Sequence, residues 1–178
     1  MTTTIPRIHI VGRKNAGKTT LVCELIREFT DRGLRVASIK HTHHHHELDT
    51  PGKDSYRHRE SGAAAVGILS PGTTAIFIPA DREAAGQPHE DRYVPFEPVF
   101  AACDLILVEG DLQTSAPRLE VWRPETSQTP YCQTDPKIAA LISDTPPTNL
   151  SIPCCPRSDL NAIASEILRL SSVLKQSR

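Results

Sequence analysis

The first forty residues constrain the fold more than any other part of the chain. Residues 8–11 form a short apolar run, a glycine-rich loop follows, and residues 18–30 then carry apolar side chains at helical spacing. Gly33 is placed to end that helix, and a second apolar run occupies residues 36–39. The order strand, loop, helix and strand predicts a βαβ unit, and such units form parallel sheets covered by helices.

The glycine-rich loop matches the pattern Gly-x-x-x-x-Gly-Lys-Ser/Thr. Gly12 and Gly17 allow backbone N–H groups to turn towards bound phosphate, and the anion then lies at a helix N-terminus. Lys18 is positioned for the β- and γ-phosphates of a nucleoside triphosphate, Thr19 for Mg²⁺, and Thr20 for the α-phosphate. The predicted nucleotide-binding residues here are Gly12, Arg13, Lys14, Asn15, Ala16, Gly17, Lys18, Thr19 and Thr20.

The rest of the chain fits an α/β protein. Further apolar runs at residues 65–69, 75–78, 105–108, 119–122 and 138–142 predict strands buried on both faces. Polar, proline-rich stretches predict surface loops at residues 79–98 and 113–117, and a last helix is predicted after residue 158 or 159. At 178 residues, we predict one domain over residues 1–178. The predicted fold is a P-loop NTPase with a mostly parallel sheet flanked by helices on both faces.

A P-loop enzyme also needs an acidic residue near its metal ion, at the end of a buried strand. Glu109 follows the apolar run 105–108, so it is expected at the edge of the sheet where ligands of open α/β folds bind. Glu109 and Thr19 are therefore the candidate Mg²⁺ residues, whereas Asp104 is expected in a turn. A solvated glutamate at the strand end is the alternative interpretation.

Charge and composition exclude several functions. Lys and Arg total 20 against 21 Asp and Glu, so the chain has no basic field to hold nucleic acid. The N-terminus lacks the apolar core of a signal peptide and no apolar run reaches about 20 residues, so we expect a cytoplasmic protein without a membrane partner. The 5 cysteines include no Cys-x-x-Cys pair, which favours reduced thiols.

Several motifs, taken in order, resemble the MobB family of adaptors in molybdopterin-guanine dinucleotide biosynthesis. They are Gly-Lys-Thr-Thr at 17–20, Ile-Lys-His-Thr-His-His at 39–44, Asp-x-Pro-Gly-Lys-Asp-Ser at 49–55, Ser-Gly-Ala-Ala at 61–64 and Leu-Ile-Leu-Val-Glu-Gly at 105–110. The resemblance implies a homodimer that binds GTP with Mg²⁺, hydrolyses it weakly, and assists the molybdenum cofactor guanylyltransferase that attaches GMP to molybdopterin. The chain departs from the family in its four successive histidines after Thr42 and in Ala16, where relatives commonly have a hydroxyl residue.

Residues 49–55 follow the second predicted strand, so they are expected beside the phosphates. Asp49 is a candidate to orient a water molecule or an outer metal ligand, and Lys53 to neutralise the γ-phosphate or the pterin phosphate. A turn with solvated charges is the alternative. The Asn-Lys-x-Asp signature of guanine-specific GTPases is absent, and Asp144 is the candidate acceptor for the guanine N–H groups.

Two other functions remain open from the sequence. The histidines suggest a nickel-inserting metallochaperone GTPase, because imidazole binds Ni²⁺ and Zn²⁺; they are His41, His43, His44, His45 and His46. The second of these alternatives is a small-molecule P-loop kinase. Specific Ni²⁺ binding would favour the metallochaperone, and phosphoryl transfer to a metabolite would favour the kinase.

Overall fold

The computed structural model describes residues 5–42, 47–79 and 91–176, which fall into two compact units: Met1–Thr42 with His89–Arg178, and His43–Pro88. The first unit contains β1 (Arg7–Val11), α1 (Lys18–Asp31), β2 (Val36–Lys40), η2 (Asp91–Phe96), α3 (Glu97–Phe100), β5 (Leu105–Glu109), β6 (Arg118–Val121), η3 (Tyr131–Gln133), β7 (Ile138–Ile142), β8 (Cys154–Cys155) and α4 (Leu160–Gln176). The second contains α2 (Asp54–Glu60), β3 (Val66–Leu69) and β4 (Thr74–Phe77). The division into two compact units does not test the prediction of one domain over residues 1–178, which stays a prediction.

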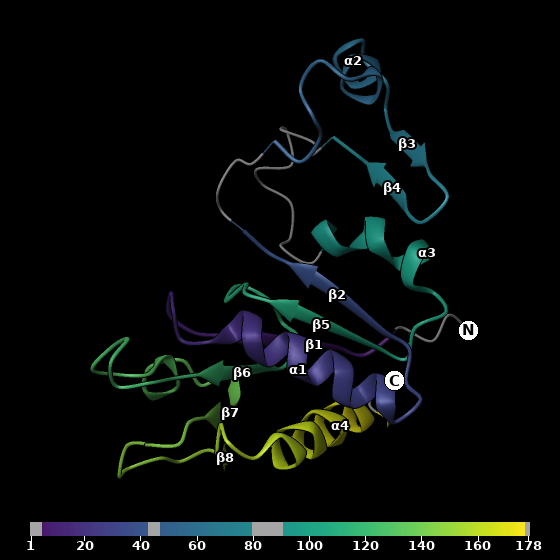
Figure 1. Ribbon diagram of the computed structural model, residues 1–178. Helices are drawn as coiled ribbons and strands as arrows, with labels where there is room; N and C mark the ends of the chain where they lie inside the picture. The colour runs from purple at the N-terminus through teal and green to yellow at the C-terminus, as the bar shows by residue number, and fades with distance from the viewer. Residues whose placement is uncertain (1–4, 43–46, 80–90, 177–178) are drawn as a thin grey trace. The chain divides into compact units, whose positions relative to one another are not determined.

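The first unit is built on a sheet of six parallel strands in the order β2-β5-β1-β6-β7-β8. The strand that precedes the glycine-rich loop, β1, is central and pairs with β5 on one side and β6 on the other. Because the strands are parallel, their C-terminal ends share one edge, towards which the β2, β5 and β6 arrows point in Figure 1. The predicted α/β fold with a parallel sheet is confirmed.

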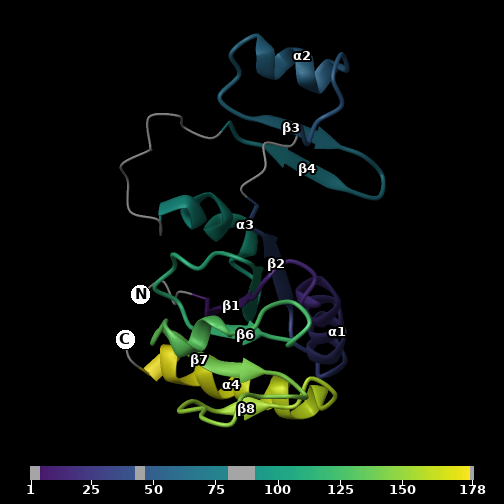
Figure 2. The ribbon, with the colours of Figure 1, turned by 90° about the vertical axis from the view of Figure 1, so that its left-hand side faces the viewer.

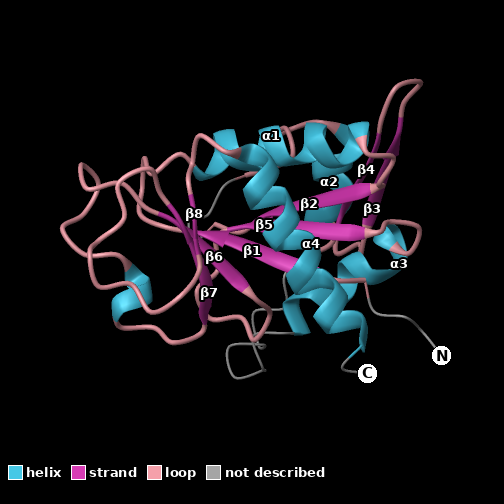
Figure 3. Cartoon of the chain, turned by 90° about the horizontal axis from the view of Figure 1, so that it is seen from below, coloured by secondary structure: helices cyan, strands magenta, loops and turns pink. Residues whose placement is uncertain are grey.

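Alternate residues of each strand face opposite sides of this sheet. On one face, Ile8 and Ile10 of β1 join apolar residues of β5, β6 and β7 in a core closed by α1 and α4. On the other face, Ala37, Ile106 and Val108 pack with Tyr93 of η2. Figure 2 shows α1 and α3 on opposite sides of the sheet, and Figure 3 shows α1 and α4 over the same strands. Helical segments therefore cover both faces, as predicted.

Two of the predicted buried strands lie outside this sheet. Residues Val66–Leu69 and Thr74–Phe77 pair antiparallel as the β3–β4 hairpin of the second unit. The Ser70 backbone N–H donates to the Thr73 carbonyl at 3.0 Å, which closes the short turn between them. Leu69 is 87% exposed and Ile76 is 55% exposed, so the prediction that both strands are buried on both faces is wrong. A run of apolar residues does not specify the strand's partner, and here a four-residue connection permits only an antiparallel one.

The segment predicted as a loop at residues 79–98 contains ordered helical structure. Residues Asp91–Phe96 form the 3-10 helix η2, which runs into α3, while residues 80–90 lie outside the described part of the chain. Tyr93 is only 5% exposed, because its ring packs against the second core. The predicted loop at 113–117 carries no helix or strand, although Thr114 within it is buried.

Candidate nucleotide-binding site

The loop between β1 and α1 lies at the C-terminal edge of the sheet, directly against β6. Gly12 adopts φ 142°, Asn15 φ 64° and Gly17 φ 97°, conformations that side-chain-bearing residues rarely adopt. A Cβ atom on Gly12 would collide with the carbonyl oxygen of Val121, the last residue of β6. The first glycine of the motif is therefore needed for close approach of two backbones as well as for its φ angle.

Lys18 opens α1, and its ammonium group is folded over the loop. Its Nζ donates to the carbonyl oxygens of Gly12 at 3.0 Å and Arg13 at 2.9 Å. Burial lowers the pKa of Lys18 below its ordinary 10.5, the nearby Glu109 carboxylate opposes that shift, and Lys40 adds to it. The loop thus holds a cation within reach of Glu109, at the position where its backbone can cradle an anion.

Thr19 and Glu109 come from separate elements and meet beside Lys18. The Thr19 hydroxyl, in the first turn of α1, donates to Glu109 Oε1, at the end of β5, at 2.7 Å. A hydroxyl and a carboxylate are both hard oxygen donors of the kind that Mg²⁺ prefers, so the pair suits this ion. The structure brings the two candidate metal residues together, and their role in metal binding stays a prediction.

Buried polar contacts anchor the chain just beyond Glu109. The Nδ1–H group of His9 donates to the Gly110 carbonyl at 3.1 Å, and the Tyr93 hydroxyl donates to Asp111 Oδ2 at 2.6 Å. Asp111 is 5% exposed. Its burial would raise the pKa of the carboxyl, but the hydrogen bonds from Tyr93 and the Gln113 backbone and the charge of Arg92 hold that pKa below 3.8. This network fixes the strand end that carries Glu109.

The side chains of the remaining loop residues differ in their contacts and exposure. The Arg13 guanidinium stacks over the Tyr131 ring, 4.3 Å from its centroid. Tyr131 is itself held by the fully buried Glu120, which accepts hydrogen bonds from the Tyr131 and Cys132 backbone N–H groups at 2.8 and 2.9 Å. Burial raises the pKa of Glu120, and these hydrogen bonds oppose the shift. Exposed positions around the loop and first turn include Lys14, Asn15 and Thr20, and Ala16 is fully buried.

Arg123 is a residue at this site that the sequence analysis missed. It follows Trp122 just beyond β6, and its Nη2 atom is 3.2 Å from the position that a Cβ on Gly17 would occupy. The two residues are far apart in the sequence, so the loop motif gives no sign of the contact. The one signal in the sequence was its position directly after the apolar run 119–122, at the sheet edge where the loop lies.

Asp144, the candidate for guanine recognition, follows β7 at the same edge of the sheet. Its Oδ1 accepts hydrogen bonds from the backbone N–H and the hydroxyl of Ser158, at 2.9 and 2.8 Å. These hydrogen bonds lower the pKa of Asp144, so the carboxyl stays ionised at neutral pH. The contacts tie the end of β7 to the turn before α4, and the base-binding role stays a prediction.

Asp49 and Lys53, the two candidate catalytic residues, belong to the second unit. Asp49 is 7% exposed, and its Oδ1 accepts from the Thr50 backbone N–H at 2.8 Å and from the Ser55 hydroxyl at 2.9 Å. Its buried Oδ2 has no hydrogen-bond partner among the residues described. Lys53 is exposed at the N-terminus of α2. The contacts show a turn held by Asp49, and both catalytic roles stay predictions.

The histidine run at residues 43–46 lies outside the described part of the chain. His41 is described, and its Nε2 lies 2.8 Å from Arg92 Nη1. Within residues 5–42, 47–79 and 91–176, no three His, Cys, Asp or Glu side chains are grouped so as to hold a metal ion. The five cysteines form no disulfide in the described structure, and their reduced state stays a prediction.

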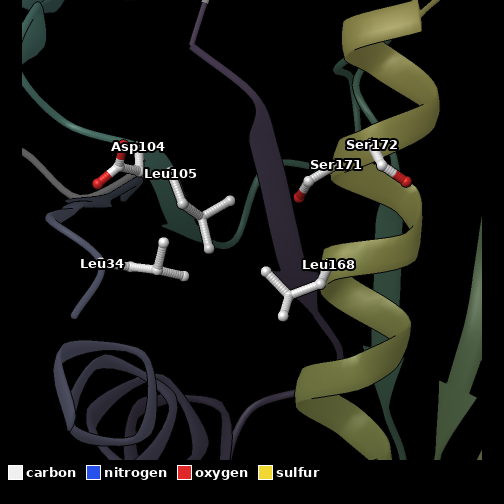
Figure 4. Close-up of a pocket in the computed structure, with 6 residues that line it drawn as sticks. All are labelled: Leu34, Asp104, Leu105, Leu168, Ser171 and Ser172. Carbon is white, nitrogen blue, oxygen red and sulfur yellow. The ribbon is translucent and has the colours of Figure 1, made fainter. Parts of the chain in front are cut away.

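A pocket of about 250 Å³ lies away from the P-loop (Figure 4). Leu34, Leu105 and Leu168 line it at the N-terminal ends of β2 and β5 and on α4. The polar groups there serve the fold, because Asp104 accepts from the Arg35 backbone at 2.9 Å and Ser171 donates to the Ile167 carbonyl at 2.7 Å.

No helix in the described part of the chain is long and apolar enough to cross a membrane.

Comparison with known proteins identifies the family of this chain. The pattern of the family described as MobB, molybdopterin guanine dinucleotide synthesis protein B, matches residues 7–144. The chain is 33% identical over 146 residues to the molybdopterin-guanine dinucleotide biosynthesis adapter protein of Haemophilus influenzae, covering 82% of this chain and 79% of that protein. It is 30% identical over 167 residues to the adapter protein of the same name in Escherichia coli, covering 93% of each. A crystal structure of molybdopterin-guanine biosynthesis protein B superposes with a TM-score of 0.68 at 27% identity, over 93% of this chain and 99% of the other. The chain therefore belongs to the MobB family.

Proposed function

We propose that this protein binds GTP with Mg²⁺ on the loop at residues 12–19 and acts as an adapter in molybdopterin-guanine dinucleotide biosynthesis. The observation that carries the proposal is the contact of Thr19 with Glu109 at 2.7 Å beside Lys18. It joins a metal-suited oxygen pair to a glycine loop at a helix N-terminus, the two parts that a Mg²⁺-nucleotide site needs. The adapter role is supported by the names of the relatives from Haemophilus influenzae and Escherichia coli.

Different residues are proposed to bind the phosphates and the metal ion. Backbone N–H groups of the loop and the Lys18 ammonium bind the β- and γ-phosphates, and Thr19 and Glu109 hold the Mg²⁺ ion. When bound, Mg²⁺ neutralises charge that the triphosphate would otherwise hold unpaired. In the second unit, Asp49 is proposed to orient a water molecule or an outer metal ligand through Oδ2, which has no hydrogen-bond partner among the described residues. Lys53 is proposed to neutralise the γ-phosphate or the phosphate of molybdopterin.

Calorimetry of GTP binding in the presence of Mg²⁺ tests the site. Lys18→Ala removes a charge-assisted contact, typically about 1.5–3 kcal/mol, and should weaken binding by more than about tenfold. Lys137→Ala is the matched control, because Lys137 is exposed at the opposite, N-terminal end of β7. If the two folded variants bind GTP with equal affinity, the assignment of the loop as the phosphate-binding site is refuted.

Asp144 is proposed to select guanine, because its ionised carboxylate can accept hydrogen bonds from the guanine N–H groups. Adenine does not offer N–H donors in the same pattern. Asp144→Asn should therefore weaken GTP binding and leave ATP binding unchanged. Ser158→Ala is the control: it removes a donor to Asp144 Oδ1 and keeps the carboxylate. If both variants keep the wild-type ratio of GTP to ATP affinity, another group reads the base.

The adapter proposal predicts slow chemistry and a partner. We propose that the protein works as a homodimer with the molybdenum cofactor guanylyltransferase. We also propose that the isolated protein hydrolyses well below about one GTP per second. Slow hydrolysis is expected because GTPases become about 10³–10⁵ times faster when a further arginine or glutamine is added to the site. Steady-state assays with and without the transferase, together with a pull-down and a measurement of molar mass, test this. Fast turnover by the isolated protein, or no association and no effect at micromolar concentration, would favour an independent enzyme.

A further inference from the structure

We propose that Arg123 binds the α- and β-phosphates of the nucleotide, on the side of the loop opposite Glu109. This inference rests on the proposed function and adds a binding residue to the same site. It begins from the position of the guanidinium, whose Nη2 atom is 3.2 Å and Cζ atom 3.7 Å from where a Cβ on Gly17 would lie. Since Gly17 has no side chain, the guanidinium rests directly beside the backbone of the loop.

Among the residues that the structure describes, none is a hydrogen-bond or ion-pair partner that would explain the position of the Arg123 side chain. No hydrogen bond or ion pair joins its guanidinium to any residue within the described ranges, whereas Arg118 is paired with Asp135 at 2.9 Å and Arg157 with Glu24 at 2.6 Å. Its backbone carbonyl does take part in a turn, accepting from the Thr126 N–H at 3.0 Å and the Thr126 hydroxyl at 2.8 Å. The turn therefore fixes where the residue sits and leaves its charge available for an anion.

A guanidinium suits this position because its fork of N–H donors can bind two phosphate oxygens at once. The loop already supplies backbone N–H groups and Lys18, but Lys18 is a single point charge that contacts the carbonyls of Gly12 and Arg13. The Arg13 side chain is directed at Tyr131. Arg123 thus brings to the phosphate-binding loop a guanidinium that is not paired within the described part of the chain.

The order of the strands indicates which phosphates Arg123 meets. Glu109 ends β5 and Arg123 follows β6, and these strands flank β1 on opposite sides. Glu109 would hold the Mg²⁺ ion, which would neutralise charge on the β- and γ-phosphates. Beyond β6 lies β7, and Asp144 follows the end of β7, so a nucleoside read by Asp144 extends towards the Arg123 side. Arg123 then lies between the loop and the nucleoside, beside the phosphates that GDP and GTP share.

The experiment measures dissociation constants for GTP and GDP, each with Mg²⁺ and with EDTA, on three full-length variants. Arg123→Ala should weaken both nucleotides by the same factor, about tenfold or more, in either buffer. Arg123→Lys should recover part of the loss, because it restores the charge without the fork of donors. Arg27→Ala, which removes an exposed arginine from α1, is the control and should bind as wild type does. The melting temperature of the ligand-free Arg123→Ala protein should match that of wild type, since the substitution breaks no hydrogen bond or ion pair to a described residue.

The outcomes separate this inference from the function on which it rests. If Lys18→Ala weakens binding while Arg123→Ala binds GTP and GDP as wild type does, the nucleotide site stands and the role of Arg123 is refuted. A loss confined to GTP, or one that requires Mg²⁺, would refute its placement on the shared phosphates. A wild-type protein that binds neither nucleotide would overturn both proposals.

Discussion

Replacing Gly12 with alanine tests how tightly β6 confines the phosphate loop. An alanine at φ 142° adopts a sparsely populated conformation, which costs about 1–3 kcal/mol. Its Cβ would also press on the carbonyl group of Val121, and overpacking of this kind adds about 1–3 kcal/mol. The lower conformational entropy of the unfolded alanine chain offsets about 0.4–1 kcal/mol. We therefore expect the free energy of unfolding to fall by roughly 1–6 kcal/mol.

Gly33 provides the matched control for this change. It has φ 81°, and no atom lies within 4 Å of the place that a Cβ would take, so Gly33→Ala carries the conformational cost of about 1–2 kcal/mol without a collision. Thermal unfolding, where about 1 kcal/mol corresponds to about 2–4 °C for a chain of this size, should rank Gly12→Ala below Gly33→Ala. Only Gly12→Ala should weaken GTP binding, because relief of the collision shifts the loop. Equal melting temperatures and equal affinities would refute the confinement of the loop by β6.

Three further changes probe the site and the network behind it. Lys18→Ala should lower GTP affinity by more than about tenfold in calorimetry, with far-UV circular dichroism confirming the fold. Glu109→Gln should keep nucleotide affinity within a few-fold and reduce Mg²⁺-dependent hydrolysis; unchanged hydrolysis and Mg²⁺ dependence would assign the metal to another acid. Tyr93→Phe should lower the free energy of unfolding by about 1.5–3 kcal/mol, because it removes a buried hydrogen bond to the Asp111 carboxylate. Since the pKa of Asp111 is held below 3.8 in the folded protein, its stabilisation is fully present above that pH and lost as the pH falls through the folded-state value. Denaturant titrations of both proteins should therefore differ most near neutral pH and converge in acid, and a constant difference would contradict this explanation.

The parts of the fold that could be predicted are those encoded by neighbouring residues. The glycine loop, the amphipathic α1 and the apolar β1 follow one another, and each limits what the next can form. The same kind of local pattern misled the prediction for β3 and β4. An apolar run of four residues is compatible with a buried parallel strand and with an exposed hairpin, and the 87% exposure of Leu69 shows that the hairpin is formed.

The parts of the site that could not be predicted depend on contacts between distant segments. Arg123 lies beside Gly17 only because β6 is next to β1 in the sheet. The order of the strands cannot be predicted from the glycine loop or from the apolar run before Arg123. Tyr93 lies in a stretch whose polar, proline-rich composition predicted a surface loop, yet its ring fills the second core. In both cases a single residue is fixed by a neighbour that the local sequence does not reveal.

The central position of β1 determines when this protein can fold during synthesis. β1 is among the first segments made, but its partners β5 and β6 come from residues Leu105–Glu109 and Arg118–Val121. A ribosome adding about 5–20 residues per second must therefore produce more than half of the chain before the strand that carries the phosphate loop has a neighbour on either side. Until then Ile8 and Ile10, both fully buried in the finished protein, have no strand to pair beside them. Parallel pairing between such distant segments is slow, so the apolar residues of β1 stay exposed to aggregation until the later strands are made.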